Sequence, residues 1–164
     1  MMRFEADVSG NERIQRVLRE LAETINPQMK KLLMREIGAD YVDFVKTEVF
    51  DKQRSHQRKK WAKLKPSTIN LKRWSGNTRG AEFVGTWTGD LVESLKFRVV
   101  GDSVLIGSDL IYSGTFHFFV KKGAFGNGSP WGDIPARPFL GVSERADKRI
   151  LKVMNKFFRT DIIK

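Results

Sequence analysis

Two histidines are the residues of this chain best suited to metal binding or proton transfer. His56 and His117 are its only histidines, and neither has another histidine or a cysteine at the spacing of known zinc sites. A site built from a histidine and distant carboxylates would leave no such spacing, so that alternative stays open. A histidine that is simply packed or exposed is the more frequent case. We therefore predict no metal site and no cofactor.

The other residues that could do chemistry lack the patterns that chemistry requires. The chain has neither the Gly-x-Ser-x-Gly turn of a serine nucleophile nor the Gly-x-x-x-x-Gly-Lys-[Ser/Thr] loop that binds phosphates. Ser113 and His117 have a spacing that most proteins offer. Asp40 and Asp43 are expected to be solvated, because acid–base work needs a cleft and shifted pKa values. We predict a protein that is not an enzyme. A distant alternative is a nuclease whose active site shows no clear sequence motif.

A run of positive charge is the feature best suited to binding. Residues 52–73, called the basic segment below, contain nine lysines and arginines and no acidic residue, in a chain of formal net charge +11. Lysine and arginine neutralise phosphates, and an aromatic side chain among them can stack on a base. The residues considered for contact with DNA or an acidic partner are Arg54, Arg58, Lys59, Lys60, Lys63 and Lys65.

Trp61 and Leu64 lie within the basic segment and allow two interpretations. They could contact a base or a protein partner, or they could anchor the segment onto the core. Like charges at this density repel one another unless an anion is nearby. We therefore expect an exposed, mobile excursion at about residues 52–73, with a helical turn near Ser67–Leu71.

Composition bounds the class of protein. The 164 residues fit a single domain, residues 1–164, and 40% hydrophobic content is too high for general disorder. The absence of cysteine excludes disulfides and thiolate metal sites, and suits a reducing cytoplasm. The apolar runs are too short for a membrane span or a signal peptide, so we expect no membrane partner.

Hydrophobic periodicity predicts three elements before the basic segment. The alternation from Phe4 to Val8 indicates a short strand. Apolar residues at helical spacing from Ile14 to Ile25 predict an amphipathic helix. Asn26-Pro27 is a good start for a second helix, whose apolar stripe runs to about Asp51.

A β-hairpin is the strongest strand signal. Residues 95–106 alternate on both sides of Gly101-Asp102, which predicts two antiparallel strands joined by a type II′ turn. Residues 112–119 are ambiguous between helix and strand, and a glycine-rich loop is expected at about residues 120–133. Ser143 is expected to cap a final helix. The predicted fold is α+β: an antiparallel sheet with a central hairpin, packed against two N-terminal helices and a C-terminal helix.

The proline-rich run before the final helix is expected to be extended. Pro135 and Pro138 bracket Ala136 and Arg137, and residues before proline avoid the α region. Arg137 could pair with a carboxylate in bidentate fashion, and Phe139 could bury against the core or a neighbour. Alternatively, this run simply locks the chain ahead of the last helix.

Four segments in this order and spacing resemble the phage virion morphogenesis family, which includes Mu-like tail-completion proteins. They are Trp61-x-x-Leu64 with Thr68 and Lys72; Thr88-Gly89-Asp90-Leu91 with Ser94; Ile106-Gly107-Ser108 with Tyr112 and His117; and Ile134-Pro135-Ala136-Arg137-Pro138-Phe139-Leu140-Gly141. The last run is the most specific, and the resemblance covers about residues 1 to 160. The long stretch 118–133 and Trp87 depart from the family pattern.

The resemblance implies a structural role late in assembly of the tail or the head–tail junction, by a homo-oligomer that forms a ring. It brings no catalytic residues and no small-molecule substrate. Partners would be tail or head–tail junction proteins, with possible contact to genome DNA, in the bacterial host cytoplasm and then in the virion. The candidate assembly contacts are Trp61, Leu64, Arg137 and Phe139. The alternative function is nucleic-acid binding through the basic segment.

Overall fold

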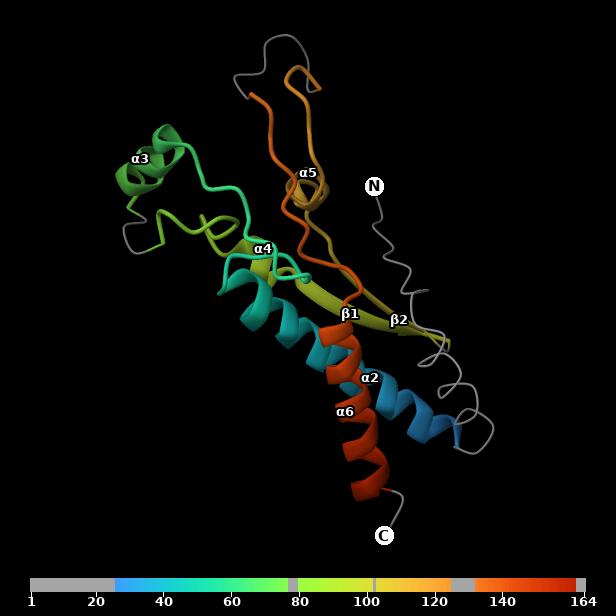
Figure 1. Cartoon of the computed structure of the whole chain (residues 1–164). Coiled ribbons are helices and arrows are strands. Elements are labelled where there is room, and N and C mark those ends of the chain that lie inside the picture. The colour runs from blue at the N-terminus through green and yellow to red at the C-terminus, as the bar shows by residue number, and fades with distance from the viewer. Residues whose placement is uncertain (1–25, 77–79, 102, 125–131, 162–164) are drawn as a thin grey trace.

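The computed structural model of the chain describes residues 26–76, 80–101, 103–124 and 132–161 (Figure 1). The strand expected at Phe4–Val8 and the helix expected at Ile14–Ile25 lie outside these residues. Within them the chain forms helices around one two-stranded antiparallel sheet, so the predicted α+β class is confirmed. No helix in the described ranges is both long enough and apolar enough to cross a membrane.

The central helix begins where the sequence predicts. Helix α2 spans Pro27–Phe44, and the Asn26 side chain accepts a hydrogen bond from the backbone N–H of Gln28 at 2.9 Å. It continues as the π-helix η1, Val45–Phe50, so the predicted extent is confirmed but its last turns are wider than α-helical. In a π-helix residues i and i+5 share a face, which lets Val45 and Phe50 both face the core.

The predicted hairpin is confirmed. Strands β1 (Leu95–Val100) and β2 (Ser103–Ser108) pair in register from Leu95↔Ser108 to Val100↔Ser103. Gly101 has a φ of 55°, as both type I′ and type II′ turns require at this position. Since residue 102 lies outside the described part, the type II′ assignment stays a prediction.

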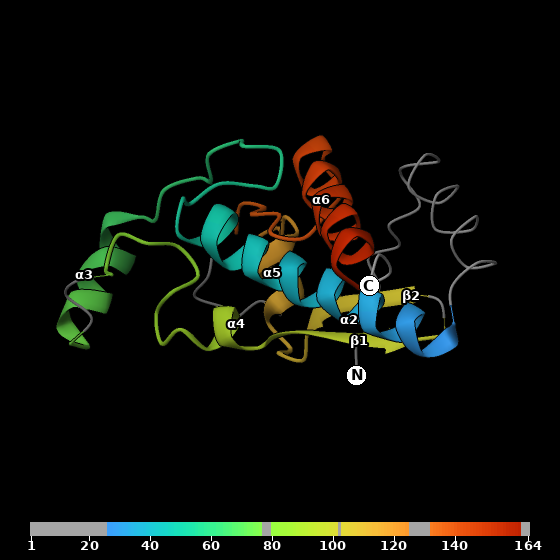
Figure 2. The same ribbon diagram turned by 90° about the horizontal axis from the view of Figure 1, so that it is seen from below.

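Helix α2 lies between the hairpin and the last helix (Figure 2). On one side, Gly38 lets β1 approach closely, because a Cβ atom there would collide with the Phe97 ring. On the other side lies α6, Glu144–Asp161, whose Met154 and Phe157 bury against Leu33 and Ile37 of α2. The expected cap of α6 is confirmed, since the Ser143 hydroxyl accepts a hydrogen bond from the Ala146 N–H at 3.3 Å.

Short elements complete the chain. Helix α3, Pro66–Trp74, stands apart from the rest in both views and contains the predicted turn Ser67–Leu71 (Figures 1 and 2). Helix α4, Asp90–Glu93, precedes β1. The ambiguous residues 112–119 contain α5, Ser113–His117. After it, Val120 and Ile134 exchange two backbone hydrogen bonds of 3.0 and 2.8 Å, which close the base of the glycine-rich loop.

Candidate functional site

Trp61 lies in the core of the protein. Its side chain is only 7% exposed, and its ring meets those of Phe50 and Phe116 edge-on at centroid distances of 5.3 and 5.5 Å. Leu64 packs against the same cluster. Trp61 therefore anchors the basic segment onto the core, and its burial leaves no exposed ring surface on which a base could stack.

Arg137 is buried and holds the basic segment to the proline-rich run. Its Nε and Nη2 each donate to the carbonyl oxygen of Ala62 at 3.2 Å, and its Nη1 donates to that of Pro135 at 3.4 Å. Burial lowers the pKa of the guanidinium. The expected carboxylate partner is therefore corrected: the bidentate acceptor is a backbone carbonyl, which leaves no signal in the sequence.

Two further contacts complete this junction. The indole Nε1 of Trp61 donates to the carbonyl oxygen of Pro138 at 3.3 Å. Phe139 is buried against Phe50, with ring centroids 5.6 Å apart, and is therefore not on the surface. We call these contacts, together with those of Arg137, the clasp. Of the alternatives for the proline-rich run, the clasp supports a lock ahead of α6.

Tyr41 and His56 fix the chain just after the clasp, and neither was singled out in the sequence for this role. The Tyr41 hydroxyl donates to the Gly141 carbonyl at 2.6 Å and accepts from the Gly141 N–H at 3.3 Å. Burial raises the pKa of this hydroxyl. Gly141 has a φ of 153°, and a Cβ atom there would collide with the His56 ring, so only glycine fits.

Both histidines serve packing. The Nδ1 atom of His56 is buried and has no hydrogen-bond partner among the described residues. His117 accepts a long hydrogen bond of 3.4 Å from the Phe139 N–H through Nδ1. Burial lowers the pKa of both rings, and the His56 charge lowers that of His117 further. No group of three or more potential metal ligands occurs within the described ranges.

Glu48 neutralises part of the basic segment. Its carboxylate accepts from Lys52 at 2.8 Å and from Arg54 at 2.7 Å, and Arg145 of α6 lies at 2.5 Å. These partners, with the Lys52 hydrogen bond first, lower the pKa of Glu48 to about 2 in spite of its partial burial. Arg54, a candidate for DNA contact, is thus paired within the chain.

Two more cations of the basic segment also have internal partners. Lys72 is buried, and its ammonium donates to the carbonyl oxygens of Gly80 at 2.9 Å and Phe83 at 2.7 Å. Burial lowers the pKa of this ammonium. Arg73 pairs with Glu82 at 3.2 Å. The expectation of an exposed segment is therefore wrong at Lys72, because carbonyl oxygens of the loop after α3 accept hydrogen bonds from its ammonium.

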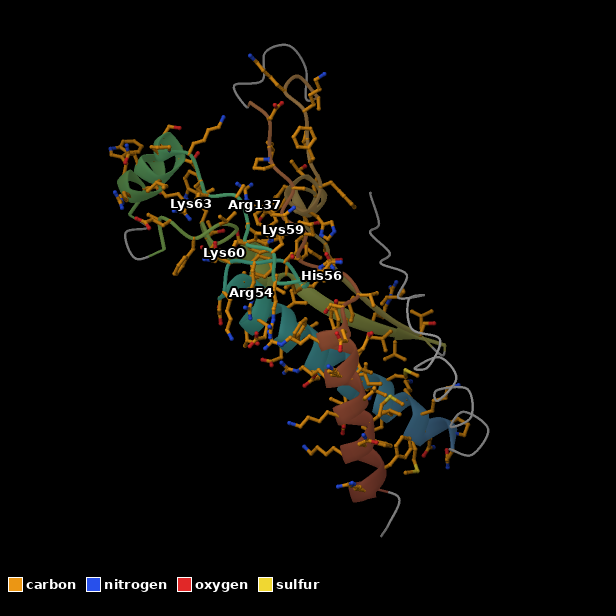
Figure 3. The ribbon with its side chains drawn as sticks, in the orientation of Figure 1. Arg54, His56, Lys59, Lys60, Lys63 and Arg137 are labelled. Carbon is orange, nitrogen blue, oxygen red and sulfur yellow. The ribbon has the colours of Figure 1, made fainter. Side chains whose placement is uncertain are left out.

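The remaining cations are exposed and form no ion pair in the described part of the chain. They are Arg58, Lys59, Lys60, Lys63 and Lys65. Their backbone is folded into a loop: the Ser55 N–H donates to the Lys59 carbonyl and the Arg58 N–H to that of Ser55, both at 2.8 Å. Figure 3 shows Lys59, Lys60 and Lys63 along the chain that leads from η1 to α3.

The carboxylates of α2 tie it to α6. Arg149 donates to Asp40 and Asp43 at 2.6 Å each, and its guanidinium lies 5.8 Å from the Phe44 ring centroid. Asp43 is solvated as expected, with its side chain 57% exposed, whereas Asp40 is partly buried; both also pair with Arg149 of α6. In the sequence, Asp40 and Asp43 are only two carboxylates at i and i+3. Nothing in that spacing indicates that Arg149 is their partner.

The four segments singled out in the sequence contact one another, and the third meets the fourth where the Phe139 N–H donates to His117. The clasp joins the first segment, at Trp61, to the fourth, at Pro138. The second and third segments meet where the Ser94 and Ser108 hydroxyls share a hydrogen bond of 2.6 Å at the open end of the hairpin. Segments that are far apart in the sequence therefore fix the same parts of the fold.

Fold and site together define a basic α+β protein. Residues of its four sequence segments hold the fold together through mutual contacts, and the five cations of the basic segment without an ion pair among the described residues are exposed. The chain belongs to the phage virion morphogenesis family, whose model matches residues 10–159. It is thus a protein of phage virion morphogenesis. Neither the curated proteins nor the solved structures gave a match.

Proposed function

We propose that this protein completes the phage tail or joins it to the head, as a homo-oligomeric ring and without catalytic turnover. The observation that carries the proposal is the family match over residues 10–159. It acts first in the cytoplasm of the host cell and then within the virion, through contacts with copies of itself and with other virion proteins.

Exposed apolar side chains support a role in assembly. Ile111 is 97% exposed and Trp74 is 87% exposed, and half-exposed aromatic rings occur at Phe83 and Phe119. Large apolar groups that gather on a surface mark sites of protein association. By contrast, the candidate contacts Trp61, Arg137 and Phe139 are buried, so their contribution to assembly is to hold the surface in shape.

Association of the purified chain with itself and with tails tests the proposal. Light scattering of the nuclease-treated protein should show a defined oligomer, and negative-stain images should show rings, both alone and at one end of isolated tail tubes. In the phage, inactivating the gene should leave heads and tails unjoined or tails unfinished. A strict monomer that associates with no tail or head component would overturn the proposal.

Contact with DNA is a second candidate, favoured by the five exposed cations at Arg58, Lys59, Lys60, Lys63 and Lys65. Neutralising phosphates releases counterions, so binding should weaken steeply with salt, with a slope of about 0.9 per phosphate contact. The variant Arg58→Glu/Lys59→Glu/Lys60→Glu should bind duplex DNA more weakly and with a smaller slope. The control is Lys52→Glu, which changes a lysine already paired with Glu48. This variant should bind DNA as strongly as wild type does.

A further inference from the structure

The two histidines contact the end of the proline-rich run from two different elements. His56 belongs to the loop after η1, and its ring lies so close to Gly141 that a Cβ atom on that residue would collide with it. His117 is the last residue of α5, and its ring meets that of Phe139 edge-on at a centroid distance of 5.0 Å. Both rings therefore help to hold residues 139–141, just ahead of α6.

The hydrogen bond of His117 requires a neutral ring. Its Nδ1 atom accepts from the Phe139 N–H at 3.4 Å, so the single proton of the neutral ring is on Nε2. A second proton would have to go on Nδ1, where it would turn this acceptor into a donor that faces another donor. Protonation of His117 therefore breaks its contact with the backbone of Phe139.

The site of His56 also disfavours a second proton. Its Nδ1 atom is buried and has no hydrogen-bond partner among the described residues. The charged ring carries a proton on each nitrogen, so its Nδ1–H would be a buried donor without an acceptor, which costs free energy. His56 therefore fits against Gly141 better as a neutral ring with its proton on Nε2.

Ionisable groups from α2, α6 and the proline-rich run also lie around these contacts. The Tyr41 hydroxyl of α2 bonds to Gly141, and its pKa is raised by burial and by the charge of Asp147 on α6, so it is neutral. The guanidinium of Arg137 lies 5.9 Å from the ring centroid of Phe116 in α5 and adds positive charge. These neighbours offer a protonated imidazole no acceptor that the neutral ring lacks.

No carboxylate of the described residues stabilises a positive charge on either ring. The other charged residues near His56 in its own loop, Arg58 and Lys59, are cations. Burial lowers the pKa of His56 from its ordinary 6.5, and burial followed by the His56 charge lowers that of His117. The direction of both shifts agrees with what the hydrogen bonds require.

We propose that His56 and His117 form a proton-sensitive latch, in which protonation of the rings releases residues 139–141 from the loop and from α5. The pKa of each ring is lower in the held state, so the released state binds more protons. The latch is therefore fully closed above pH 6.5 and weakens as the pH falls from there. Helix α6 keeps its own contacts with α2 through Arg149 and Phe157, so the release is local.

Hydrogen exchange of the full chain, followed by mass spectrometry from about pH 8 to about pH 5, tests the latch. The readout is the protection factor, in which the observed rate is compared with the intrinsic rate at each pH. Protection at residues 139–141 should fall below pH 6.5, by up to about tenfold per pH unit for each ring that takes up a proton on release. Protection at residues 33–38 of α2 should stay constant.

Non-titrating variants isolate the two rings. In His117→Asn a side-chain acceptor for the Phe139 N–H remains, and in His56→Leu no polar atom is left unpaired. The variant that combines both should keep constant protection at residues 139–141 over the whole pH range. The control Glu48→Gln removes an ionisable group of η1 whose pKa is about 2, so it should lose protection below pH 6.5 as wild type does.

Three results would overturn the latch. The first is constant protection at residues 139–141 in wild type, and the second is a wild-type loss of protection in the folded double variant. The third is an equal loss in α2, which would mean that the histidines support the whole fold instead of this run. If the double variant does not fold, NMR titration of the wild-type ring protons decides, since a pKa of 6.5 or above for either ring contradicts the latch.

Discussion

The indole nitrogen of Trp61 donates a hydrogen bond to the carbonyl oxygen of Pro138, 77 positions further along the chain. This contact, the Arg137 bonds to Ala62 and the edge-on rings of Phe50 and Phe116 form one junction. The basic segment and the proline-rich run are thereby fixed to the end of η1. The first predictions concern how much stability this junction supplies.

Truncating Trp61 should destabilise the fold severely. Trp61→Ala removes a buried ring and leaves a cavity, which costs about 3–5 kcal/mol of unfolding free energy. Trp61→Phe keeps most of the ring contacts but loses the bond to Pro138, which costs about 1 kcal/mol. Urea unfolding followed by circular dichroism measures both. Near-equal losses for the two variants would mean that the hydrogen bond, and not the packing, dominates.

Replacing Arg137 should be costly although no acidic residue pairs with it. Arg137→Met leaves the Ala62 carbonyl without its two donors and should lower the unfolding free energy by about 1–3 kcal/mol. Arg137→Lys cannot donate in bidentate geometry and should recover only part of this loss. The surface control Lys59→Met should stay within about 0.5 kcal/mol of wild type.

Gly38 should resist replacement by the best helix former. In an open helix, Gly→Ala gains about 1 kcal/mol. Here the new methyl group meets the Phe97 ring, and overpacking costs about 1–3 kcal/mol, so Gly38→Ala should be destabilising overall. Adding Phe97→Leu should relieve part of the penalty. Ala39→Gly, at the exposed neighbouring position, measures the propensity effect alone.

Acid should weaken the contact between η1 and α6 through Glu48. Its pKa is 4.5 without neighbours and about 2 in the folded protein, chiefly because of the Lys52 hydrogen bond. The folded value is the lower one, so this stabilisation is complete above pH 4.5 and is lost as the pH falls from there toward 2. Unfolding free energies of wild type and Glu48→Gln should converge over this window. A constant difference between them would contradict the assignment.

Lys72 should hold the loop after α3 in place. Lys72→Met removes the donors to the Gly80 and Phe83 carbonyls, so amide hydrogen exchange should accelerate at residues 80–86. Arg73→Met removes only the exposed ion pair with Glu82, which contributes little, and should change exchange in this loop much less than Lys72→Met does. Equal exchange in the two variants would show that the loop is held by other contacts.

Local patterns carried much of the fold. The Asn26-Pro27 start, the alternation around Gly101 and the Ser143 cap each depend on neighbours within a few residues, and the structure has all three. The switch from α2 to η1 was not foreseen, because it depends on which side chains the core accepts at Val49 and Phe50 rather than on periodicity.

Long-range partners were the part that sequence could not supply. Carbonyl oxygens accept from Lys72, Arg137 and Trp61, and a backbone acceptor has no residue type to reveal it. The basic segment was accordingly expected to be an exposed excursion, although anchoring through Trp61 and Leu64 was one of the two interpretations. Trp74 and Ile111 are the most exposed large apolar residues that the structure describes, and the sequence did not single them out. A tryptophan or an isoleucine is ordinarily expected in the core, and only the fold shows that these two are exposed.

The clasp also contributes to how the molecule bears mechanical load. Tension applied through α2 and α6 is borne first by the contacts that join these helices directly, those of Arg149 with Asp40 and Asp43, and beyond them by the bonds of Tyr41, Arg137 and Trp61. While those bonds hold, the intervening chain, with α3, the hairpin and α5, carries none of that tension. Surfaces on this intervening chain would thus keep their shape in a subunit that is being pulled.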